Sequence, residues 1–316
     1  MRPRSGSTCI SLHPRNAALL AGLAFDRLLG AEIGPLDRPI VTRAMGRVLY
    51  VDHADTESLR AKYAGDAGVR ADAIMPVDCV WDEHGIDRLV QAHGPVDYVV
   101  ASHVIEHVPD LIGWLRAVGR ALAPSGEIRL VVPDKRFCFD HHRAESTLAD
   151  LLAAHAAGAR MPPLARIADY FLHVVEVDAA AVWAGRPPPP PVVDAGRYRW
   201  AEGVCREVRD SGRYQDVHCW VFTPRRMCLL LAELAAFGVL ELECTLFRDT
   251  ERDGLEFLLG LRGNADPAMA AASWREAASR ATSEPDAAPE LSSTADIPGR
   301  SWLTRLSGSY RAARRS

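Results

Sequence analysis

One run of residues near the middle of the chain constrains the fold more than any other. Val96–Ser102 is largely apolar and rich in β-branched side chains. Its last residue, Ser102, begins a polar stretch with His103, Glu106 and His107 just before a helix start at Pro109-Asp110. Apolar runs of this length are typical of strands buried on both faces of a parallel sheet. Open α/β sheets bind ligands where such strands end. The sequence therefore predicts an α/β protein with a binding site that follows Ser102.

Strands and helices alternate on both sides of this run, which favours a parallel sheet with right-handed crossovers. N-capping residue types mark several helix starts, including Asp55, Asp110 and Thr223-Pro224. We expect a doubly wound, seven-stranded Rossmann-like sheet. The predicted strands are Ala31–Ile33, Arg47–Asp52, Asp72–Val77, Val96–Ser102, Glu127–Val132, Leu240–Phe247 and Leu255–Leu261, and the predicted early helices are Leu19–Leu29, Leu59–Tyr63, Asp82–His93 and Leu111–Leu122.

The regular alternation stops after Pro133 and resumes near Thr223. We expect one domain over residues 1–263, with an insertion at 134–219 that contains the proline run Arg186–Pro191. An ordered insertion of this size usually forms a lid or a specificity wall. Residues 264–316 are rich in Ala, Ser and Pro and are expected to be largely disordered. The basic end, Arg300–Ser316, is a possible docking segment for a protein partner, although a solvated end is the simpler interpretation.

Composition narrows the class of protein. The chain has 316 residues, of which 48% are apolar and 25% charged, and a net charge of −4, so no nucleic-acid partner is expected. Seven cysteines without a C-x-x-C pair indicate buried thiols in a reducing, cytoplasmic setting. Ala17–Phe25 is too interrupted to predict a signal peptide or a membrane span. Abundant Ala and Arg with only two lysines suggest a GC-rich, bacterial-like coding bias.

Two polar positions follow the first two predicted strands. Gly34, in the run Glu32-Ile33-Gly34-Pro35, allows the backbone to approach a ligand closely. Asp52 lies twenty residues beyond Glu32 at the end of the second strand, where a carboxylate is able to accept both hydrogen bonds of a ribose diol. Each position alone is equally compatible with a plain strand end, but their order and spacing together favour a nucleotide-type site.

Val96–Asp110 resembles the fourth-strand motif of class I S-adenosylmethionine-dependent methyltransferases, and Glu32–Pro35 resembles a reduced form of their first motif, E-x-G-x-G-x-G. The resemblance is to the type 11-like methyltransferase domain and covers roughly Leu28–Gly263. It implies S-adenosyl-L-methionine bound across the ends of the first, second and fourth strands. The residues it assigns to this cofactor are Glu32, Gly34, Asp52, Asp78 (or Asp82) at the adenine, and Ser102 with His103 at the methionine portion.

Two other ligands fit the same positions less well. A dinucleotide needs the G-x-G-x-x-G turn, which is missing here. His103, Glu106 and His107 resemble the H-x-x-E-H zinc pattern, but such a site needs a long helix and a distal ligand. The sequence therefore predicts no metal.

Three residues are candidates for catalysis. His218 is the first choice as general base, oriented by Asp216 or another acid, if 217–222 is extended and turns His218 and Trp220 into the cleft. A structural histidine packed beside a tryptophan is an equal alternative. His107 is the second candidate. Asp134 is the third, as a residue that orients the acceptor.

Neighbouring residues suggest the kind of acceptor. Lys135 and Arg136 suit a carboxylate, phosphate or sugar acid, and Tyr198 and Trp200 suit a sugar ring. We expect methyl transfer to a small-molecule or saccharide (glycan-type) acceptor, with the methylated atom left open. The alternative is a non-catalytic cofactor-binding or scaffold protein with a degenerate methyltransferase fold.

Overall fold

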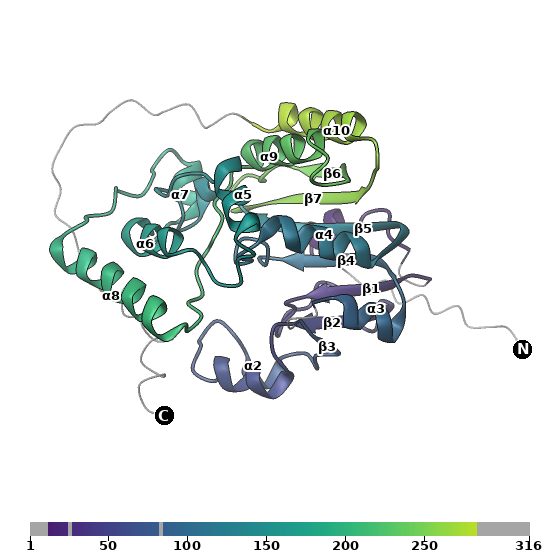
Figure 1. Ribbon diagram of the computed structural model, residues 1–316, viewed down its shortest axis with the longest axis horizontal. Coiled ribbons are helices and arrows are strands. Elements are labelled where there is room, and N and C mark those ends of the chain that lie inside the picture. The colour runs from purple at the N-terminus through teal and green to yellow at the C-terminus, as the bar shows by residue number, and fades with distance from the viewer. Residues whose placement is uncertain (1–11, 25–26, 82–84, 283–316) are drawn as a thin grey trace, which may run out of the picture.

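The computed structural model describes residues 12–24, 27–81 and 85–282. Within these residues the centre is a seven-stranded sheet in the order β3-β2-β1-β4-β5-β7-β6 (Figure 1). The first five strands are parallel, and β7 runs antiparallel to both β5 and β6. The predicted seven-stranded α/β fold is confirmed. The strands are β1 Leu29–Ile33, β2 Arg47–Asp52, β3 Cys79–Val80, β4 Val96–Ser102, β5 Leu122–Pro133, β6 Leu242–Arg248 and β7 Glu256–Gly263.

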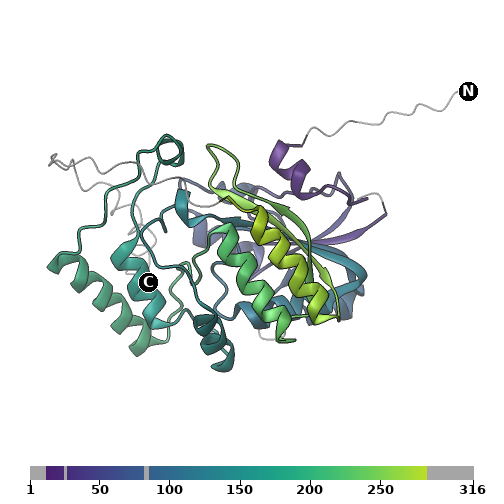
Figure 2. The ribbon, with the colours of Figure 1, turned by 90° about the horizontal axis from the view of Figure 1, so that it is seen from above.

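Helices cover both faces of the sheet. Figure 2 shows α9 and α10 on one face and α1 on the opposite side. Alternation along β4 explains the two layers, since Val99 and Ala101 pack with the α4, α9 and α10 side while Tyr98 and Val100 pack with the α1 side. The helices are α1 Pro14–Leu19, α2 Thr56–Tyr63, α3 Asp87–His93, α4 Leu111–Ala121, α5 Leu148–Ala156, α6 Leu164–His173, α7 Ala179–Trp183, α8 Ala195–Ser211, α9 Pro224–Ala236 and α10 Pro267–Arg280, with 3-10 turns η1 Ala71–Ala73 and η2 Lys135–Phe137.

Local side-chain caps begin the helices that the sequence predicted. Asp55 accepts a hydrogen bond from the Ser58 N–H at 2.8 Å, and Asp110 accepts one from the Gly113 N–H at 2.8 Å. Thr223 caps α9 in the same way. These bonds satisfy amides that have no partner inside the helix, which is why the starts are readable from sequence.

Two early predictions were wrong. The helix expected at Leu19–Leu29 ends instead at Leu19, since Gly22 adopts a left-handed φ of 84° that a helix excludes. The strand expected at Asp72–Val77 is an irregular segment with a 3-10 turn, and β3 begins only at Cys79. The Val77 N–H donates to the Thr56 hydroxyl, so this segment is held by α2 and not by the sheet edge.

The insertion forms its own small layer. α6 and α8 pack through an apolar cluster, separate from the main core, that includes Ile167, Phe171 and Val204. Figure 1 shows these two helices beyond the edge of the sheet, on the left of the view. The insertion is therefore ordered and helical over much of its length.

The fold also extends past Gly263, where the sequence had placed its end. α10 packs on α9 and β6 with Trp274 fully buried, and the Trp274 indole N–H donates to the Leu242 carbonyl at 2.8 Å. The sequence analysis missed this helix because its buried face holds four alanines beside Trp274. Alanines permit close helix packing, but in the sequence they resemble a low-complexity tail. The basic end proposed as a docking segment and Asp82 both lie outside the described residues.

Within the described ranges, no helix combines the length and the apolar character that a membrane crossing requires.

Candidate functional site

A cleft of about 1020 Å³ opens where β1, β2 and β4 end. Gly34, Asp52 and His103, each within one residue of a strand end, all contribute to its wall. The parallel order of these strands brings their carboxyl ends to one edge, as the sequence predicted. The other lining residues are Ile33, Leu36, His53, Lys62, Tyr63, Trp81, Gly85, Ile86, Asp87, Val104, His107, Val108, Pro109, Asp110, Gly113, Trp114, Ala117, Arg120, Ala159, Arg160, Tyr214 and Asp216.

The turn after β1 is shaped by a buried carboxylate. The two oxygens of Glu32 accept hydrogen bonds from the Ile40 and Val41 N–H groups at 2.7 and 2.8 Å. Burial raises the pKa of Glu32 from 4.5 to about 7, although these two backbone bonds oppose the shift. Glu32 was predicted to bind the cofactor, but the structure places it beneath the loop, where it folds the loop back over the sheet.

Gly34 lies at the tightest point of that turn. Its φ is +70°, and a Cβ built there would lie 3.0 Å from the Val104 side chain. A glycine is therefore required both for the backbone conformation and for the close approach to the loop after β4. The cleft floor is formed at this position by backbone.

Asp52 is the acid at the end of β2, and its side chain is only 4% exposed. Its Oδ1 atom accepts a hydrogen bond from the His53 N–H and contacts His53 Nδ1 at 2.6 Å. Both contacts use the same oxygen. They orient the carboxylate at the cleft wall.

Asp78 is not one of the residues that line the cleft. Both of its oxygens pair with Arg43 at 2.8 Å, and one also accepts the Tyr50 N–H. Because β3 begins after Asp78, the residue that follows this strand is Trp81, which does line the cleft and stacks on Trp114 with 5.9 Å between ring centroids. The sequence analysis overlooked Trp81 because it placed the third strand too early.

The turn after β4 presents His103. Its φ is +53°, a left-handed conformation, and its Nε2 lies 2.5 Å from Glu256 at the start of β7. Burial lowers the pKa of His103, but the neighbouring carboxylates of Glu106 and Glu256 outweigh this effect and raise the pKa to about 9. Ser102, the other predicted contact, ends β4 and is not among the lining residues.

His107 and His218 are adjacent, with ring centroids 4.7 Å apart in an edge-to-face arrangement. His107 lines the cleft and pairs through Nδ1 with Asp216 at 2.8 Å. His218 is 6% exposed, lies behind the lining residues and pairs through Nδ1 with Asp140 at 2.6 Å. The acid predicted for His218 thus serves His107, and the acid that holds His218 comes from residues just after η2.

The Trp220 side chain does not point into the cleft. It is fully buried, its indole N–H donates to the Val108 carbonyl at 2.6 Å, and 217–222 is not a strand. The expected alternation of His218 and Trp220 toward the cleft was therefore wrong. The Trp220 side chain instead fastens the chain just after the insertion to the loop after β4, and His218 is held by Asp140.

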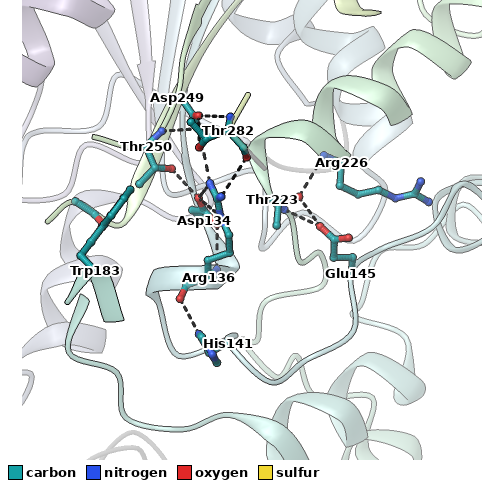
Figure 3. A network of polar contacts seen from close by, with 11 residues as sticks. Asp134, Arg136, His141, Glu145, Trp183, Thr223, Arg226, Asp249, Thr250 and Thr282 are labelled. Atoms are coloured by element: carbon teal, nitrogen blue, oxygen red, sulfur yellow. Dashed lines mark hydrogen bonds and ion pairs between the residues drawn. The ribbon is translucent and has the colours of Figure 1, made fainter. Parts of the chain in front are cut away.

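Asp134 belongs to a different network, away from the cleft (Figure 3). It is fully buried, accepts hydrogen bonds from the Arg136 guanidinium at 2.7–3.0 Å and accepts another from the Thr250 hydroxyl at 2.7 Å. Arg136, proposed from sequence as an anion or sugar contact, is instead paired with Asp134. The network links η2 to the loop between β6 and β7, so its role is structural.

The insertion supplies a wall of the cleft that sequence reasoning did not anticipate residue by residue. Ala159 and Arg160 come from the loop after α5, and Tyr214 and Asp216 follow α8. The Tyr214 hydroxyl donates to the His107 carbonyl at 3.2 Å. These residues lie more than fifty positions from β4 in the chain, and no local pattern marks them.

A protein-family model described as "Methyltransferase domain" matches residues 61–234, more than half of the chain. No curated protein matches the chain. Among solved structures, the fold is similar to a Rhodobacter sphaeroides protein described as a zinc-dependent alcohol dehydrogenase, with 16% identity, a TM-score of 0.43 and coverage of 81% of this chain and 92% of that one.

Two further solved structures are methyltransferases by name. The CcbJ methyltransferase from Streptomyces caelestis has 12% identity, a TM-score of 0.35 and coverage of 79% of this chain and 94% of that one. The magnesium protoporphyrin IX methyltransferase ChlM from Synechocystis, solved with bound SAH, has 11% identity, a TM-score of 0.32 and coverage of 79% and 80%.

Proposed function

Because this chain belongs to the methyltransferase-domain family, we propose that it is an S-adenosyl-L-methionine-dependent methyltransferase acting on a small-molecule or saccharide acceptor. The observation that carries the proposal is the cleft at the ends of β1, β2 and β4, with a bare glycine turn on one side and a buried acid on the other. The proposal places the reaction in the cytoplasm, in keeping with the free thiols of the six described cysteines.

The residues present fit this cofactor. Gly34 offers backbone without a side chain at the cleft floor, Asp52 offers a carboxylate oxygen for a ribose diol, and Trp81 offers a flat apolar surface for a base. When bound, S-adenosylmethionine supplies a methyl group already activated by its sulfonium. The protein then has mainly to align the acceptor and exclude water.

The same cleft is poorly suited to a dinucleotide. Residues 34–46, between β1 and β2, form turns and no helix. A pyrophosphate is normally held at the N-terminus of the helix that follows the first strand. In this chain the loop held by Glu32 stands where that helix would begin, and this favours a cofactor without phosphate.

The acceptor side of the cleft is assigned to the insertion. Tyr214, Asp216 and Arg160 line the wall beside His107, which is the one catalytic candidate from the sequence that lines the cleft. Their hydrogen-bonding groups suit a polar acceptor. We therefore keep His107 at the acceptor and give Asp134 no part in the reaction.

Calorimetric titration with S-adenosylhomocysteine tests the cofactor assignment. We expect saturable binding by the wild type and about 10- to 100-fold weaker binding by Asp52→Ala, the cost of a lost charged hydrogen bond. Asp78→Asn is the matched control, because that acid faces Arg43, and its affinity should match the wild type.

The opposite result would be equally informative. If folded wild-type protein fails to bind S-adenosylhomocysteine, or if Asp52→Ala binds it as well as the wild type does, the cofactor assignment is wrong. The non-catalytic scaffold would then be the better description.

A further inference from the structure

Glu106 is a buried carboxylate whose charge is not balanced by hydrogen bonds. It is fully buried, and within the described part of the chain neither of its side-chain oxygens has a hydrogen-bond partner. Its nearest basic side-chain atoms are His103 Nδ1 at 3.5 Å and His218 Nε2 at 4.0 Å. A carboxylate loses several kcal/mol of hydration on burial and is normally paired or bound to a metal.

Two histidines lie beside this carboxylate, and each is held by an acid in the way that metal ligands usually are. The Nδ1 atoms of His107 and His218 are each engaged by an aspartate, Asp216 and Asp140 respectively. A histidine whose Nδ1–H donates to a carboxylate keeps the lone pair on Nε2, and this carboxylate-histidine arrangement is the usual outer support of metal ligands. Both imidazoles are therefore preoriented by acids outside the cluster.

One atom from each of Glu106, His107 and His218 lies within 4.8 Å of the other two. We propose that these three residues bind a divalent transition-metal ion such as Zn²⁺, with Asp216 and Asp140 as positioning residues. Two histidines and a carboxylate form a known three-ligand set that leaves a fourth position open. The long helix of the H-x-x-E-H pattern is absent, but His218 supplies the distal ligand that the run His103–His107 lacks.

The cluster must contract when it binds an ion. Metal–ligand bonds of about 2.1 Å place tetrahedral ligands roughly 3.4 Å apart, closer than the 4.8 Å limit within which they lie here. Glu106 and His218 are buried, whereas the His107 side chain is 35% exposed and is able to move. Rotation of His107, on the cleft side, is the motion we expect.

The surrounding charges favour a dication. Glu106, Asp140 and Asp216 are acids in or directly behind the cluster, and the fixed cation bound to Asp140 is Arg143, which it shares with Asp169. His103 lies next to Glu106 but is also engaged by Glu256 at 2.5 Å. These acids supply negative charge at the cluster that a metal ion would offset.

The site adjoins the cleft, because His107 belongs to both. If the proposed methyl transfer holds, the open position suits an acceptor hydroxyl, whose pKa falls on coordination so that its proton is lost to solvent. The oxygen then attacks the methyl carbon while the carbon–sulfur bond breaks, giving the methyl ether and S-adenosylhomocysteine. This step rests on the proposed function, whereas the metal site itself does not.

Cobalt titration of chelator-treated, full-length protein tests the site without requiring turnover. Co²⁺ should bind at one equivalent with visible absorption bands and be displaced by Zn²⁺. Glu106→Gln and His218→Gln should abolish the bands, and Asp216→Asn should weaken binding about 10- to 100-fold. Asp216 is half exposed, so this last variant remains informative if the buried substitutions fail to fold.

His173→Asn is the matched control. His173 also pairs through Nδ1 with an aspartate, Asp169, at 2.7 Å and has similar exposure, but it lies outside the cluster. Its variant should bind Co²⁺ like the wild type. Absence of stoichiometric binding, or binding unchanged in folded Glu106→Gln or Asp216→Asn, overturns the metal site.

Parallel calorimetry with S-adenosylhomocysteine separates the two proposals. Normal binding of this ligand without Co²⁺ uptake refutes the metal alone. Co²⁺ uptake without binding of this ligand refutes the cofactor assignment alone.

Discussion

At the scale of single residues, the buried acids around the cleft differ in what they hold. Glu32 accepts two backbone hydrogen bonds and shapes the turn at Gly34, whereas Asp52 is held by His53 at the cleft wall. Glu106 has neither kind of support. Buried acidic side chains thus shape a loop, contact a ligand or, in our proposal, bind a metal. The hydrogen-bond donors around each carboxylate decide which of these roles it has.

Glu32 gives a pH-dependent prediction. Below pH 4.5 its carboxyl is protonated in both the folded and the unfolded chain, and above its folded pKa of about 7 it is ionised in both. Between these values the unfolded chain releases the proton first, so the residue's contribution to stability falls as pH rises. The unfolding free energy of wild type minus that of Glu32→Gln should drop by on the order of 3 kcal/mol between pH 4.5 and 7.

Urea unfolding of both proteins at a series of pH values measures this difference. A difference that is constant or rises over the interval would show that the folded carboxyl titrates normally and that burial does not dominate its pKa.

At the scale of elements, the wall of the cleft depends on how α8 is attached. α8 packs on α6 through the small apolar cluster that contains Phe171, and the Arg197 side chain donates to the Phe171 and Val174 carbonyls. The chain that leaves α8 carries Tyr214 and Asp216 into the cleft. A lid or wall role for the insertion remains a prediction, and its geometry rests on this helix pair.

Phe171→Ala should loosen that pair without reaching the cofactor side. Loss of the buried ring costs about 3 kcal/mol, so amide hydrogen exchange across α8 should accelerate while the affinity for S-adenosylhomocysteine stays within twofold. Leu164→Ala, at an exposed position on the same helix, should leave exchange unchanged. Unchanged exchange in the Phe171 variant would mean that α8 is held by other contacts.

At the scale of the whole molecule, helix α10 covers the end of the sheet formed by β6. α10 covers α9 and β6, and Trp274 bonds to the β6 backbone. Within the described residues the folded unit therefore continues past Gly263 and includes α10.

Two truncations test this boundary. A chain ending at Gly263 should lose most of its thermal stability or become insoluble, because the α9 surface that packs on α10 becomes exposed to water. A chain ending at Thr282 should melt within a few degrees of the full-length protein, about the scatter of single-site effects. Equal melting of both truncated chains would show that α10 contributes little.

The amino-acid sequence by itself determined the strands β2 and β4 and the helix caps Asp55, Asp110 and Thr223. It also determined that strands and helices alternate along the chain. These features depend on a few neighbouring residues, because apolar periodicity and side-chain capping act over one or two turns of chain. Gly34 and Asp52 could be assigned to the cleft for the same reason, since strand ends locate them.

Only the tertiary structure decided which side chains meet. It placed Glu32 beneath its loop, gave Asp134 to Arg136, joined Asp216 to His107 and brought Asp140 to His218. It also set Glu106 against His218, more than a hundred residues away. Such pairs depend on how helices and loops pack across the sheet, and packing sums many weak contacts that leave no mark in any local run of sequence.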